Sequence, residues 1–491
     1  MPLLELDIPP GVTKNGTGLQ QSGSWADANL IRWYENAMQP IGGWRKRTSS
    51  AMTGIARALL VWLDNGGGRR TAAGTPSKLY AIADANTLHD ITPSGLTVGT
   101  DDAVQNLGWN SLTYGAAEYG TPRPDSGSYT PATTWSLDSW GQYLIACSNK
   151  DGKIYEWQLN NSTVAAAVTN APTDCSAIVA TEERFIFALG AGGVGNKVQW
   201  CDQEVNTTWT PASTNQAGDF TLNTVGNLVS GHSLRGETLL LTDTDAHVAR
   251  YVGNPYVYSF NRVGTGCGAI SANGCVVADG FACWMGRNGF HIYRGGVQQL
   301  PSSVGDYVFS NFNEAQRSKV YGVLNSAFSE ITWYYPSGGA TENDSYVTFN
   351  YRENHWAIGS IARTAGVDAG IFVYPNLVGS DGFVYEHEVG FSYDSEVPFA
   401  ETGPLKIGSG DRLMVARSLI PDEKTQGDVT ATFKTRLYPN ATESSYGPFA
   451  MANPTSVRFQ GRQVRMRITS DVNTDWRVGT MRLDVKAGSG R

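Results

Sequence analysis

The feature that most constrains the fold is a short pattern that recurs along the chain. It consists of an apolar run, a turn that carries Gly, Asn or Asp, and a second apolar run. The segment "CWMGRNGFHIYRGG" shows the pattern, with its turn at Gly289. A tight hairpin needs residues that accept positive φ, and Val, Ile, Phe, Tyr and Trp in the flanking runs pack well on a pleated sheet. Each copy therefore predicts a β-hairpin, and we interpret this copy as the inner hairpin of one repeated unit.

The copies follow one another at a fairly regular spacing. A weak copy turns near Asn86, and the others turn at Gly152, Gly195, Asp245, Gly289, Asn343 and Gly382, at intervals of 43, 50, 44, 54 and 39 residues. A hairpin every ~45 residues is typical of β-propeller blades, each of which is a four-stranded sheet. The sequence therefore predicts an all-β protein with a β-propeller body of six or seven degenerate blades over residues 51–400. An array of β-sandwiches with irregularly spaced hairpins is the alternative.

Segments of different character flank the predicted propeller. Residues 1–50 form an aromatic-rich N-terminal segment that ends in a basic cluster. Residues 401–491 contain strand patterns of their own, in which Val457 and Phe459 alternate with Arg458. Alternation of this kind predicts one buried face and one cationic face. We expect residues 401–491 to form a C-terminal antiparallel β-sandwich-like domain that serves as a platform or interface.

Charge is distributed unevenly along the chain. The formal net charge is −8, but residues 401–491 contain 14 Lys and Arg against 9 Asp and Glu, a balance of +5. The first 400 residues therefore carry −13. An acidic protein of this kind is a poor candidate for sequence-specific nucleic-acid binding, because such binders gain affinity from a basic face that releases counterions. The two parts of the chain are expected to have different neighbours.

Cysteine usage and the N-terminal sequence indicate the compartment in which the protein is made. The six cysteines mostly lie in apolar runs, and we expect them to be buried free thiols of a protein made in a reducing compartment: Cys147, Cys175, Cys201, Cys267, Cys275 and Cys283. The start "MPLLELDIPPG" has no basic region and no long apolar core, so we expect no signal peptide. No apolar stretch approaches 18 residues, so no membrane insertion is expected.

Two motifs with possible ligand chemistry have simpler structural explanations. The run "GAGGVG", residues 190–195, matches a dinucleotide-binding pattern, but the strand-like "NKVQWC" follows it where a helix would be required. We interpret it as a glycine-rich hairpin loop. Asp243, Asp245 and His247 are able to gather around a metal at a turn, although Asp at such positions more often binds its own backbone.

Paired carboxylates were considered because many propellers are glycosidases. The candidates are Asp202 with Glu204, Glu386 with Asp394, and Asp381, and the histidines His232, His291, His355 and His387 are scattered. No pattern places any two carboxylates at a catalytic separation. We therefore expect no catalytic residue, no cofactor-binding residue and no metal ligand.

The order of several longer motifs resembles a known family. "SWADANLIRWYENAMQPIGGW" is followed by "VQWCDQEVNTTWTP", then "GCGAISANGCVVADGFACWMGRNGFHIY", "VTFNYRENHWAIG", and finally "YGPFAMANPTSVRFQGRQVRMRITSDVNTDWRVGTMRLDV". This succession covers most of the chain. It resembles the tail nozzle proteins of short-tailed bacteriophages, also called tail tubular protein B or packaged-DNA stabilisation proteins.

The resemblance implies a structural virion protein rather than an enzyme, with no cofactor. Six copies would form a homohexameric ring below the portal and its adaptor, retain the packaged DNA and conduct it during ejection. The partners implied are other copies of the chain, the adaptor or head-to-tail connector, tail fibre or needle proteins, and genomic double-stranded DNA that passes without sequence-specific contacts. The location implied is the virion tail, after synthesis in the bacterial cytoplasm.

Charge and aromatic content suggest which residues meet these partners. An acidic lumen would weaken phosphate binding and let DNA pass, so we hypothesise that acidic residues of the first 400 line it. The candidate subunit or adaptor interface combines two basic and aromatic clusters: Trp25, Trp44, Arg45, Arg47, Arg458, Arg462, Arg465 and Arg467. A solvated strand face is the alternative for the cationic strands.

Two other functions remain open at this level. A receptor-recognition propeller of the tail tip would bind carbohydrate through aromatic residues such as Trp140, Trp157, Trp284 and Trp356, although these also suit core packing between blades. A propeller hydrolase would act on envelope polysaccharide.

Overall fold

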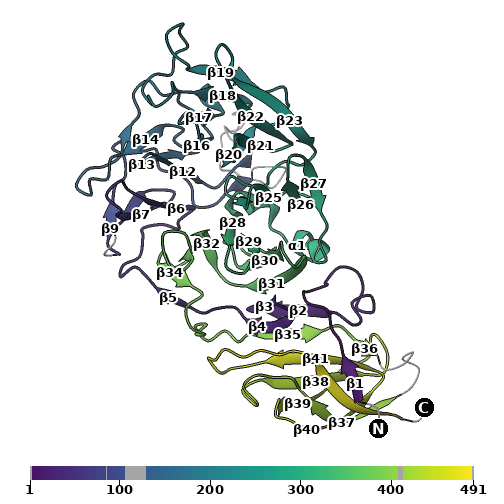
Figure 1. Ribbon diagram of the computed structural model, residues 1–491. Helices are drawn as coiled ribbons and strands as arrows, with labels where there is room; N and C mark the ends of the chain where they lie inside the picture. Colours follow the sequence, from purple (N-terminus) through teal and green to yellow (C-terminus); the bar gives the residue numbers. More distant parts are fainter. Residues whose placement is uncertain (1–2, 84–85, 106–128, 407–412, 489–491) are drawn as a thin grey trace, which may run out of the picture.

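The computed structural model describes residues 3–83, 86–105, 129–406 and 413–488 (Figure 1). Within these residues, seven four-stranded antiparallel sheets follow one another as blades around a common axis. Blade 1 contains β6 (Ala58–Leu63), β7 (Arg69–Gly74), β8 (Leu79–Ile82) and β9 (Leu88–Asp90). Blade 2 contains β12 (Trp135–Trp140), β13 (Tyr143–Ser148), β14 (Ile154–Trp157) and β15 (Ala166–Ala167). Blade 3 contains β16 (Ala177–Ala180), β17 (Ile186–Leu189), β18 (Lys197–Trp200) and β19 (Gly218–Thr221), with the 3₁₀ turn η1 (Ala191–Gly193) inside it.

The remaining blades complete the circle. Blade 4 contains β20 (Leu228–Leu234), β21 (Glu237–Thr242), β22 (Asp245–Gly253) and β23 (Val257–Thr265). Blade 5 contains β24 (Cys275–Ala278), β25 (Phe281–Met285), β26 (Phe290–Tyr293) and β27 (Val297–Leu300). Blade 6 contains β28 (Tyr321–Asn325), β29 (Glu330–Tyr335), β30 (Ser345–Asn350) and β31 (His355–Ser360). Blade 7 contains β32 (Arg363–Val367), β33 (Asn376–Gly379), β34 (Val384–His387) and β5 (Trp44–Lys46).

The ring of blades is closed. The first strand of each blade contacts the first strand of the next, and β32 of blade 7 contacts β6 of blade 1. Blade 7 takes its outermost strand, β5, from the N-terminal part of the chain, where Trp44 pairs with His387. This pairing joins segments more than 300 residues apart in the sequence. The predicted propeller is thus confirmed, with seven blades.

Six of the recurring hairpins occupy the same position within their blades. This position is the central hairpin, whereas the sequence predicted the inner hairpin. The turns at Gly152, Gly195, Gly289 and Gly382 join the second strand of a blade to the third, as do those near Asp245 and Asn343. "CWMGRNGFHIYRGG" is therefore the central hairpin β25–β26 of its blade. The central strands are covered by neighbouring blades on both faces, which explains their long apolar runs. Asn86 is an exception, since it lies between the third and fourth strands of blade 1.

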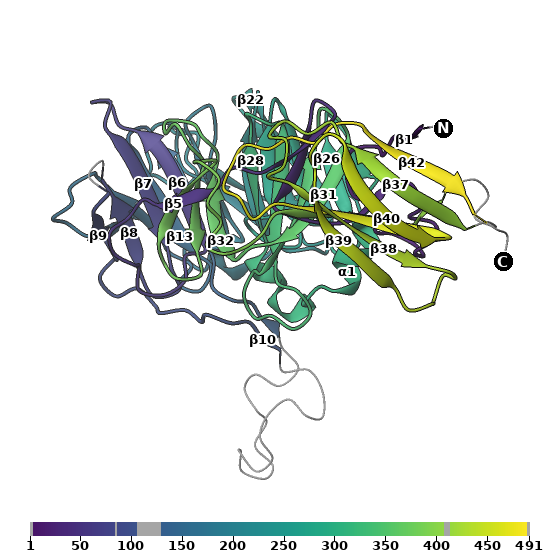
Figure 2. The same cartoon turned by 90° about the horizontal axis from the view of Figure 1, so that it is seen from below.

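Connections between blades carry the additional elements. Between blades 1 and 2, β10 (Val104–Gln105) pairs with β11 (Tyr129–Thr130), and β10 lies on one face of the propeller (Figure 2). The short helix α1 (Gly305–Ser310) and the 3₁₀ segment η2 (Glu314–Lys319) join blades 5 and 6. We call the face on which β10 lies the insertion face.

A β-sandwich lies beside the propeller. Its terminal sheet has the order β1 (Leu3–Leu6), β42 (Met481–Ala487), β37 (Met414–Ile420), β40 (Thr455–Gly461). Its junction sheet has the order β2 (Trp25–Asn29), β35 (Phe399–Thr402), β41 (Gln463–Thr469), β38 (Thr430–Arg436), β39 (Ser444–Ala450), with β36 (Leu405–Lys406) also paired to β41. As the alternation predicts, Val457, Phe459, Val464, Met466 and Ile468 are buried between the sheets.

The N-terminal segment is divided between the two bodies. In the structure β1 and β2 belong to the sandwich, β5 belongs to blade 7, and only the hairpin β3 (Ile31–Tyr34) to β4 (Ala37–Pro40) is a separate sheet. The sequence division at residue 50 places these strands in a unit of their own, whereas they pair with strands hundreds of residues away. The sandwich accordingly includes strands from both ends of the chain.

Candidate functional site

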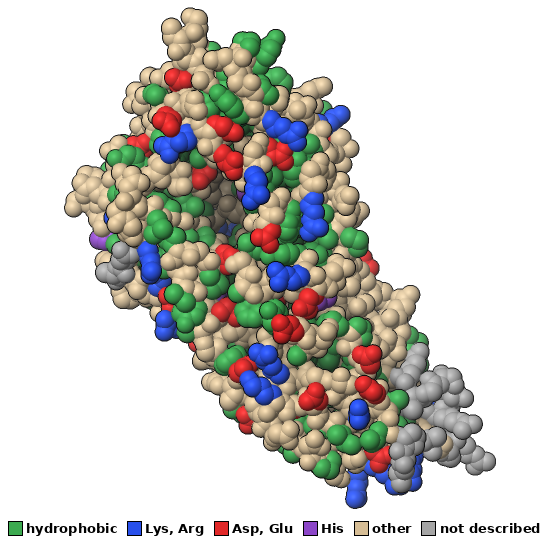
Figure 3. All heavy atoms as spheres, viewed as in Figure 1, with side chains coloured by type: hydrophobic (Ala, Val, Ile, Leu, Met, Phe, Trp, Pro, Cys, Tyr) green, Lys and Arg blue, Asp and Glu red, His purple; other side chains and the backbone are tan. Residues whose placement is uncertain are grey.

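The centre of the propeller encloses a narrow polar cavity. Its volume is about 130 Å³, and its lining comes from the first strands of six blades and from Arg57 and Asn273 beside them. A cavity of this size holds about four water molecules, at ~30 Å³ each. DNA cannot pass through it, because the major groove of a duplex alone is about 12 Å wide. Figure 3 shows a hollow at the centre of one face, with acidic and basic side chains interspersed around it.

Three buried polar atoms that line this cavity have no hydrogen-bond partner among the described residues. They are Nε2 of His232, the hydroxyl of Tyr321 and Nε of Arg57. Burial away from water disfavours the charged imidazole and lowers the pKa of His232 to about 4. The cavity is therefore lined by neutral groups together with an Arg57 whose charge is compensated, which suits enclosed water.

His232 gives the folded protein a sensitivity to acid. Between pH 6.5 and pH 4 an unfolded chain protonates this histidine while the folded chain leaves it neutral, so the stability it contributes is lost as the pH falls. We expect His232→Gln to reduce the loss of unfolding free energy between pH 7 and pH 4.5 by about 2 kcal/mol. Urea denaturation of the wild type and of His232→Gln across this pH range measures the free energy of unfolding of each. Parallel pH profiles for variant and wild type would contradict the prediction.

An ionic cluster on the insertion face fastens the segment between blades 1 and 2. Glu342 accepts two hydrogen bonds from Arg57, both of 2.6 Å, and one of 2.7 Å from Nζ of Lys319. Lys319 also donates to Asp102 at 2.5 Å. The side chains of Arg57 and Lys319 are 1% and 0% exposed. Burial alone would raise the pKa of Glu342, but Arg57 and Lys319 outweigh it and lower the pKa. These ion pairs make the cluster a structural clamp.

A second ionic cluster joins the β3–β4 hairpin to the propeller. Arg32 of β3 forms two hydrogen bonds with Glu330 of blade 6, at 2.9 and 2.7 Å, and two with Glu388 beside blade 7, at 3.0 and 2.7 Å. Its guanidinium carbon lies 3.5 Å from the ring centre of Phe328. Met38 of the same hairpin bridges to Val478 of the sandwich. The hairpin therefore locks the two bodies together.

The N-terminal members of the predicted interface are mostly buried. Trp25 packs against Trp33, and Trp44 stacks on His387, with ring centres 5.9 and 5.4 Å apart. Arg47 is buried and donates to Asn86, Thr71 and Asn376. Arg45 is exposed and forms an ion pair of 2.7 Å with Glu386. Of these four residues, only Arg45 lies at the surface of the chain.

The C-terminal members fall into two groups. Glu401 of β35 forms ion pairs with Lys434, Arg465 and Arg467, and Arg465 also pairs with Glu443. These cations of the junction sheet thus have ion-pair partners within the chain. Arg458 lies instead on the terminal sheet, exposed, and among the described residues it has no ion pair. Arg462 follows β40, with its guanidinium 5.5 Å from the ring centre of Tyr438.

Three further cations, which the sequence did not indicate as interface residues, lie on the same sheet as Arg458. Arg417 of β37 and Arg482 and Lys486 of β42 are exposed on the same terminal sheet. The alternation in "LMVARSLI" and "MRLDVKA" was the available signal, because Arg482 lies between the buried Met481 and Leu483, and Arg417 and Lys486 each follow a buried apolar residue. The structure brings these four side chains to one face.

The motifs with possible ligand chemistry have structural partners. "GAGGVG" is the loop between β17 and β18, as predicted. Asp243 accepts from the backbone of Asn227 at 2.9 Å, and Asp245 accepts from the hydroxyl of Thr224 at 2.8 Å. The described part of the chain contains no group of three His, Cys, Asp or Glu side chains placed to hold a metal ion. All six cysteines are buried and free, as expected.

The carboxylates considered for glycosidase chemistry do not meet in a common site. Asp202 caps the backbone of Gln203 and Gln216, while Glu204 pairs with Arg184 at 3.5 Å. In blade 7, three carboxylates have separate partners: Glu386 pairs with Arg45, Asp381 accepts from Tyr385 at 2.6 Å, and Asp394 accepts from Trp44 at 2.5 Å. Their hydrogen bonds stabilise turns and strand ends.

The tryptophans considered for carbohydrate binding belong to the core. Trp140, Trp157, Trp284 and Trp356 are at most 8% exposed. Trp157 and Trp284 are almost completely enclosed between blades, and Trp356 donates its indole N–H to Pro301 at 3.0 Å. Stacking on a sugar needs an accessible ring face, so these four side chains do not offer a sugar platform. No helix in the described ranges is long and apolar enough to cross a membrane.

Comparisons with known proteins gave matches among solved structures alone. No family model matches the sequence, and no curated protein matches it. Among solved structures, virginiamycin B lyase from Staphylococcus aureus aligns with a TM-score of 0.40 and 8% identity, covering 68% of this chain and 94% of the lyase. A streptogramin B lyase gives 0.40 and 8%, covering 70% and 96%. PorZ, a surface component of the type-IX secretion system of Porphyromonas gingivalis, gives 0.38 and 9%, covering 84% and 48%.

Proposed function

We propose that the chain is a structural subunit of the tail nozzle of a short-tailed bacteriophage. In this role several copies form a ring that extends the DNA channel below the portal and adaptor. One observation carries the proposal beyond the resemblance in motif order: an acidic part and a cationic part are held rigidly in one subunit. The first 400 residues carry −13 and the remainder +5, and the Arg32 cluster and the shared strands fix the two bodies to each other.

The geometry also supports a passive role for the propeller. Its own central cavity of about 130 Å³ excludes DNA, so the conduit of this proposal is the space enclosed between copies. The buried ionic groups of the Arg32 and Glu342 clusters hold separate elements together. A ring subunit needs this rigidity, because each copy must keep its geometry while a highly charged polymer moves past it.

The first test is the assembly state of the purified protein. Negative-stain electron microscopy and mass photometry are carried out on the chain alone and on the chain mixed with portal–adaptor particles. Rings of six with an open centre, formed in either sample, would support the proposal. A chain that stays monomeric and does not bind the particles would overturn it.

Charge reversal on the propeller tests the acidic lumen. Asp101 and Asp174 lie in loops of the insertion face, whereas Glu182 and Asp279 lie in turns of the opposite face, and all four are exposed. We expect one of the two Lys double variants, Asp101→Lys with Asp174→Lys or Glu182→Lys with Asp279→Lys, to slow DNA ejection several-fold at low salt. Each new lysine in the lumen adds a phosphate contact that weakens with salt, with a slope of ~0.9 per contact. Time-resolved DNA release from particles carrying each variant measures this.

Each double variant is the control for the other, because we expect only one of the two faces to line the lumen. The face that lies outside the lumen should give normal ejection. Normal ejection from both variants at low salt would contradict the acidic-lumen hypothesis while leaving the ring itself intact.

A further inference from the structure

The terminal sheet of the sandwich presents a cationic surface that the chain does not neutralise. Its outward positions carry four exposed cations, Arg417, Arg458, Arg482 and Lys486, against two carboxylates, Glu5 and Asp484. None of the four cations has an ion pair within the described residues. The neighbouring junction sheet differs, because its cations form ion pairs with Glu401 and Glu443. We call these four side chains the cationic face.

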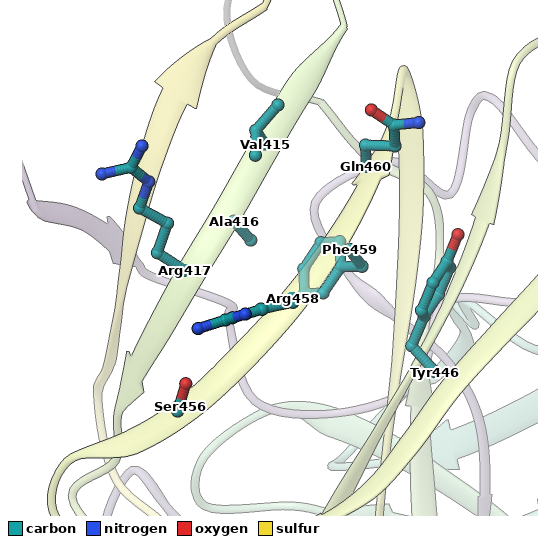
Figure 4. A pocket seen from close by; sticks show the side chains of 8 residues that line it. All are labelled: Val415, Ala416, Arg417, Tyr446, Ser456, Arg458, Phe459 and Gln460. Carbon is teal, nitrogen blue, oxygen red and sulfur yellow. The ribbon is translucent and has the colours of Figure 1, made fainter.

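A groove of about 680 Å³ borders the cationic face, and its lining includes Arg417, Arg458 and Tyr446 of β39 in the junction sheet. Figure 4 shows Arg417 of β37 and Arg458 of β40 reaching toward the same side of the sheet, with Ser456 beside them. The register explains this, because Arg417 lies at a bulge between the pairs Ala416–Phe459 and Ser418–Ser456 and so stands opposite Arg458. Side by side, two guanidinium groups repel each other unless an anion lies between them, so the arrangement favours a bound carboxylate or phosphate.

A free strand edge borders the groove. β40 pairs with β37 on one side, and among the described strands it has no partner on the other. Along this edge, Thr455–Gly461, alternate residues leave backbone N–H and C=O groups available for another strand. A polypeptide is able to use such an edge as well as the cations, whereas DNA uses only the cations. The combination therefore favours an acidic polypeptide over nucleic acid.

We infer that the cationic face binds the acidic propeller of a second copy of this chain. Charge complementarity supports this occupant, because the first 400 residues of each copy carry −13 against the +5 of the rest. The face also lies at the end of the molecule away from blades 3 and 4, so its own propeller cannot cover it (Figure 1). The contact is heterologous, joining different surfaces of two copies, as ring assembly requires. This inference rests on the proposed ring.

The experiment measures self-association by sedimentation velocity in 50–500 mM salt. Wild-type association should weaken as salt rises, because the contact is electrostatic. We expect Arg417→Glu with Arg458→Glu to raise the apparent dissociation constant at least ~10-fold at low salt. The matched control, Lys150→Glu with Arg235→Glu, makes the same charge change on exposed propeller residues and should associate at least as tightly as wild type. Circular dichroism establishes that both variants are folded.

Each contrary result has a distinct meaning. If wild-type rings form and the cationic-face variant forms them equally well, this inference falls and the ring proposal stands. If wild type shows no self-association at any salt concentration, the second-copy assignment falls, and binding to portal–adaptor particles decides the proposed function. If wild type binds a short DNA duplex and the cationic-face variant loses that binding while self-association is unchanged, the face is a phosphate site and the inference is overturned.

Discussion

Replacing Arg32 with alanine is expected to lower the free energy of unfolding by about 3–5 kcal/mol. Arg32 lies between Glu330 and Glu388, with four hydrogen bonds of 2.7–3.0 Å, and its side chain is 3% exposed. Burial disfavours its charge, but the two glutamates outweigh burial and raise the pKa of Arg32. Removing the guanidinium leaves the carboxylates of Glu330 and Glu388, whose side chains are 8% and 18% exposed, without the cation between them. Urea denaturation, followed by tryptophan fluorescence, measures the loss.

Two further variants separate charge from volume. Arg32→Met fills most of the space but leaves Glu330 and Glu388 uncompensated, so it should be nearly as destabilising as Arg32→Ala. Arg45→Ala removes an ion pair of similar length, but Arg45 is 61% exposed, so the loss of stability should be much smaller than for Arg32→Ala. If Arg32→Met restored wild-type stability, packing rather than the buried charges would be the cause.

The position of Arg32 also gives this variant a second, mechanical consequence. The β3–β4 hairpin contacts blade 6 through Arg32 and the sandwich through Met38, so it transmits the orientation of one body to the other. Losing the clamp should increase amide hydrogen exchange in residues 31–40 before either body unfolds. A ring that depends on two surfaces per subunit would then assemble less well even at temperatures where the variant is folded.

The sequence predicted the propeller because its signal is local. Each central hairpin needs an apolar strand, a turn residue such as Gly152 or Gly289 and a second apolar strand, and all three lie within about 15 residues. The buried faces of β40 and β41 were predictable for the same reason, since a period of two is visible in Val464, Met466 and Ile468. Short-range patterns of this kind survive even when the repeats share little sequence.

Long-range pairing was not predictable from such patterns. Nothing local in residues 44–46 indicates that they complete blade 7, or that residues 3–6 pair with residues 481–484. The ion pairs of Arg465 and Arg467 with Glu401 could not be predicted for the same reason. They depend on the register in which β35 pairs with β41. Counting charges along the strand therefore placed Arg465 and Arg467 with Arg458, although they belong to different sheets.

Replacing Glu342 with alanine is also expected to lower the free energy of unfolding by about 3–5 kcal/mol. Glu342 is the shared acceptor for Arg57 and Lys319, whose side chains are 1% and 0% exposed, so its loss leaves two buried cations with fewer partners. Asp102 remains on Lys319, but Arg57 keeps only its bond to the carbonyl of Asp101. The segment around residues 101–103 should loosen first, and amide hydrogen exchange there, together with urea denaturation, measures both effects.

The pKa of Glu342 gives this prediction a dependence on pH. Because Arg57 and Lys319 hold the pKa of the folded-state carboxyl below its usual value near 4.5, the stabilisation is fully present above that pH and is lost as the pH falls through the lower folded-state pKa. Glu342→Gln keeps the size of the side chain but cannot titrate, so the stability of this variant should fall less steeply in acid than that of wild type.

Glu314→Ala is the control for Glu342→Ala, since Glu314 is half exposed and pairs with Arg317 at 3.4 Å. Its free energy of unfolding should fall by less than about 1 kcal/mol. Equal losses for Glu342→Ala and Glu314→Ala would show that the cluster is a solvated surface network rather than a buried clamp that fastens the segment between blades 1 and 2.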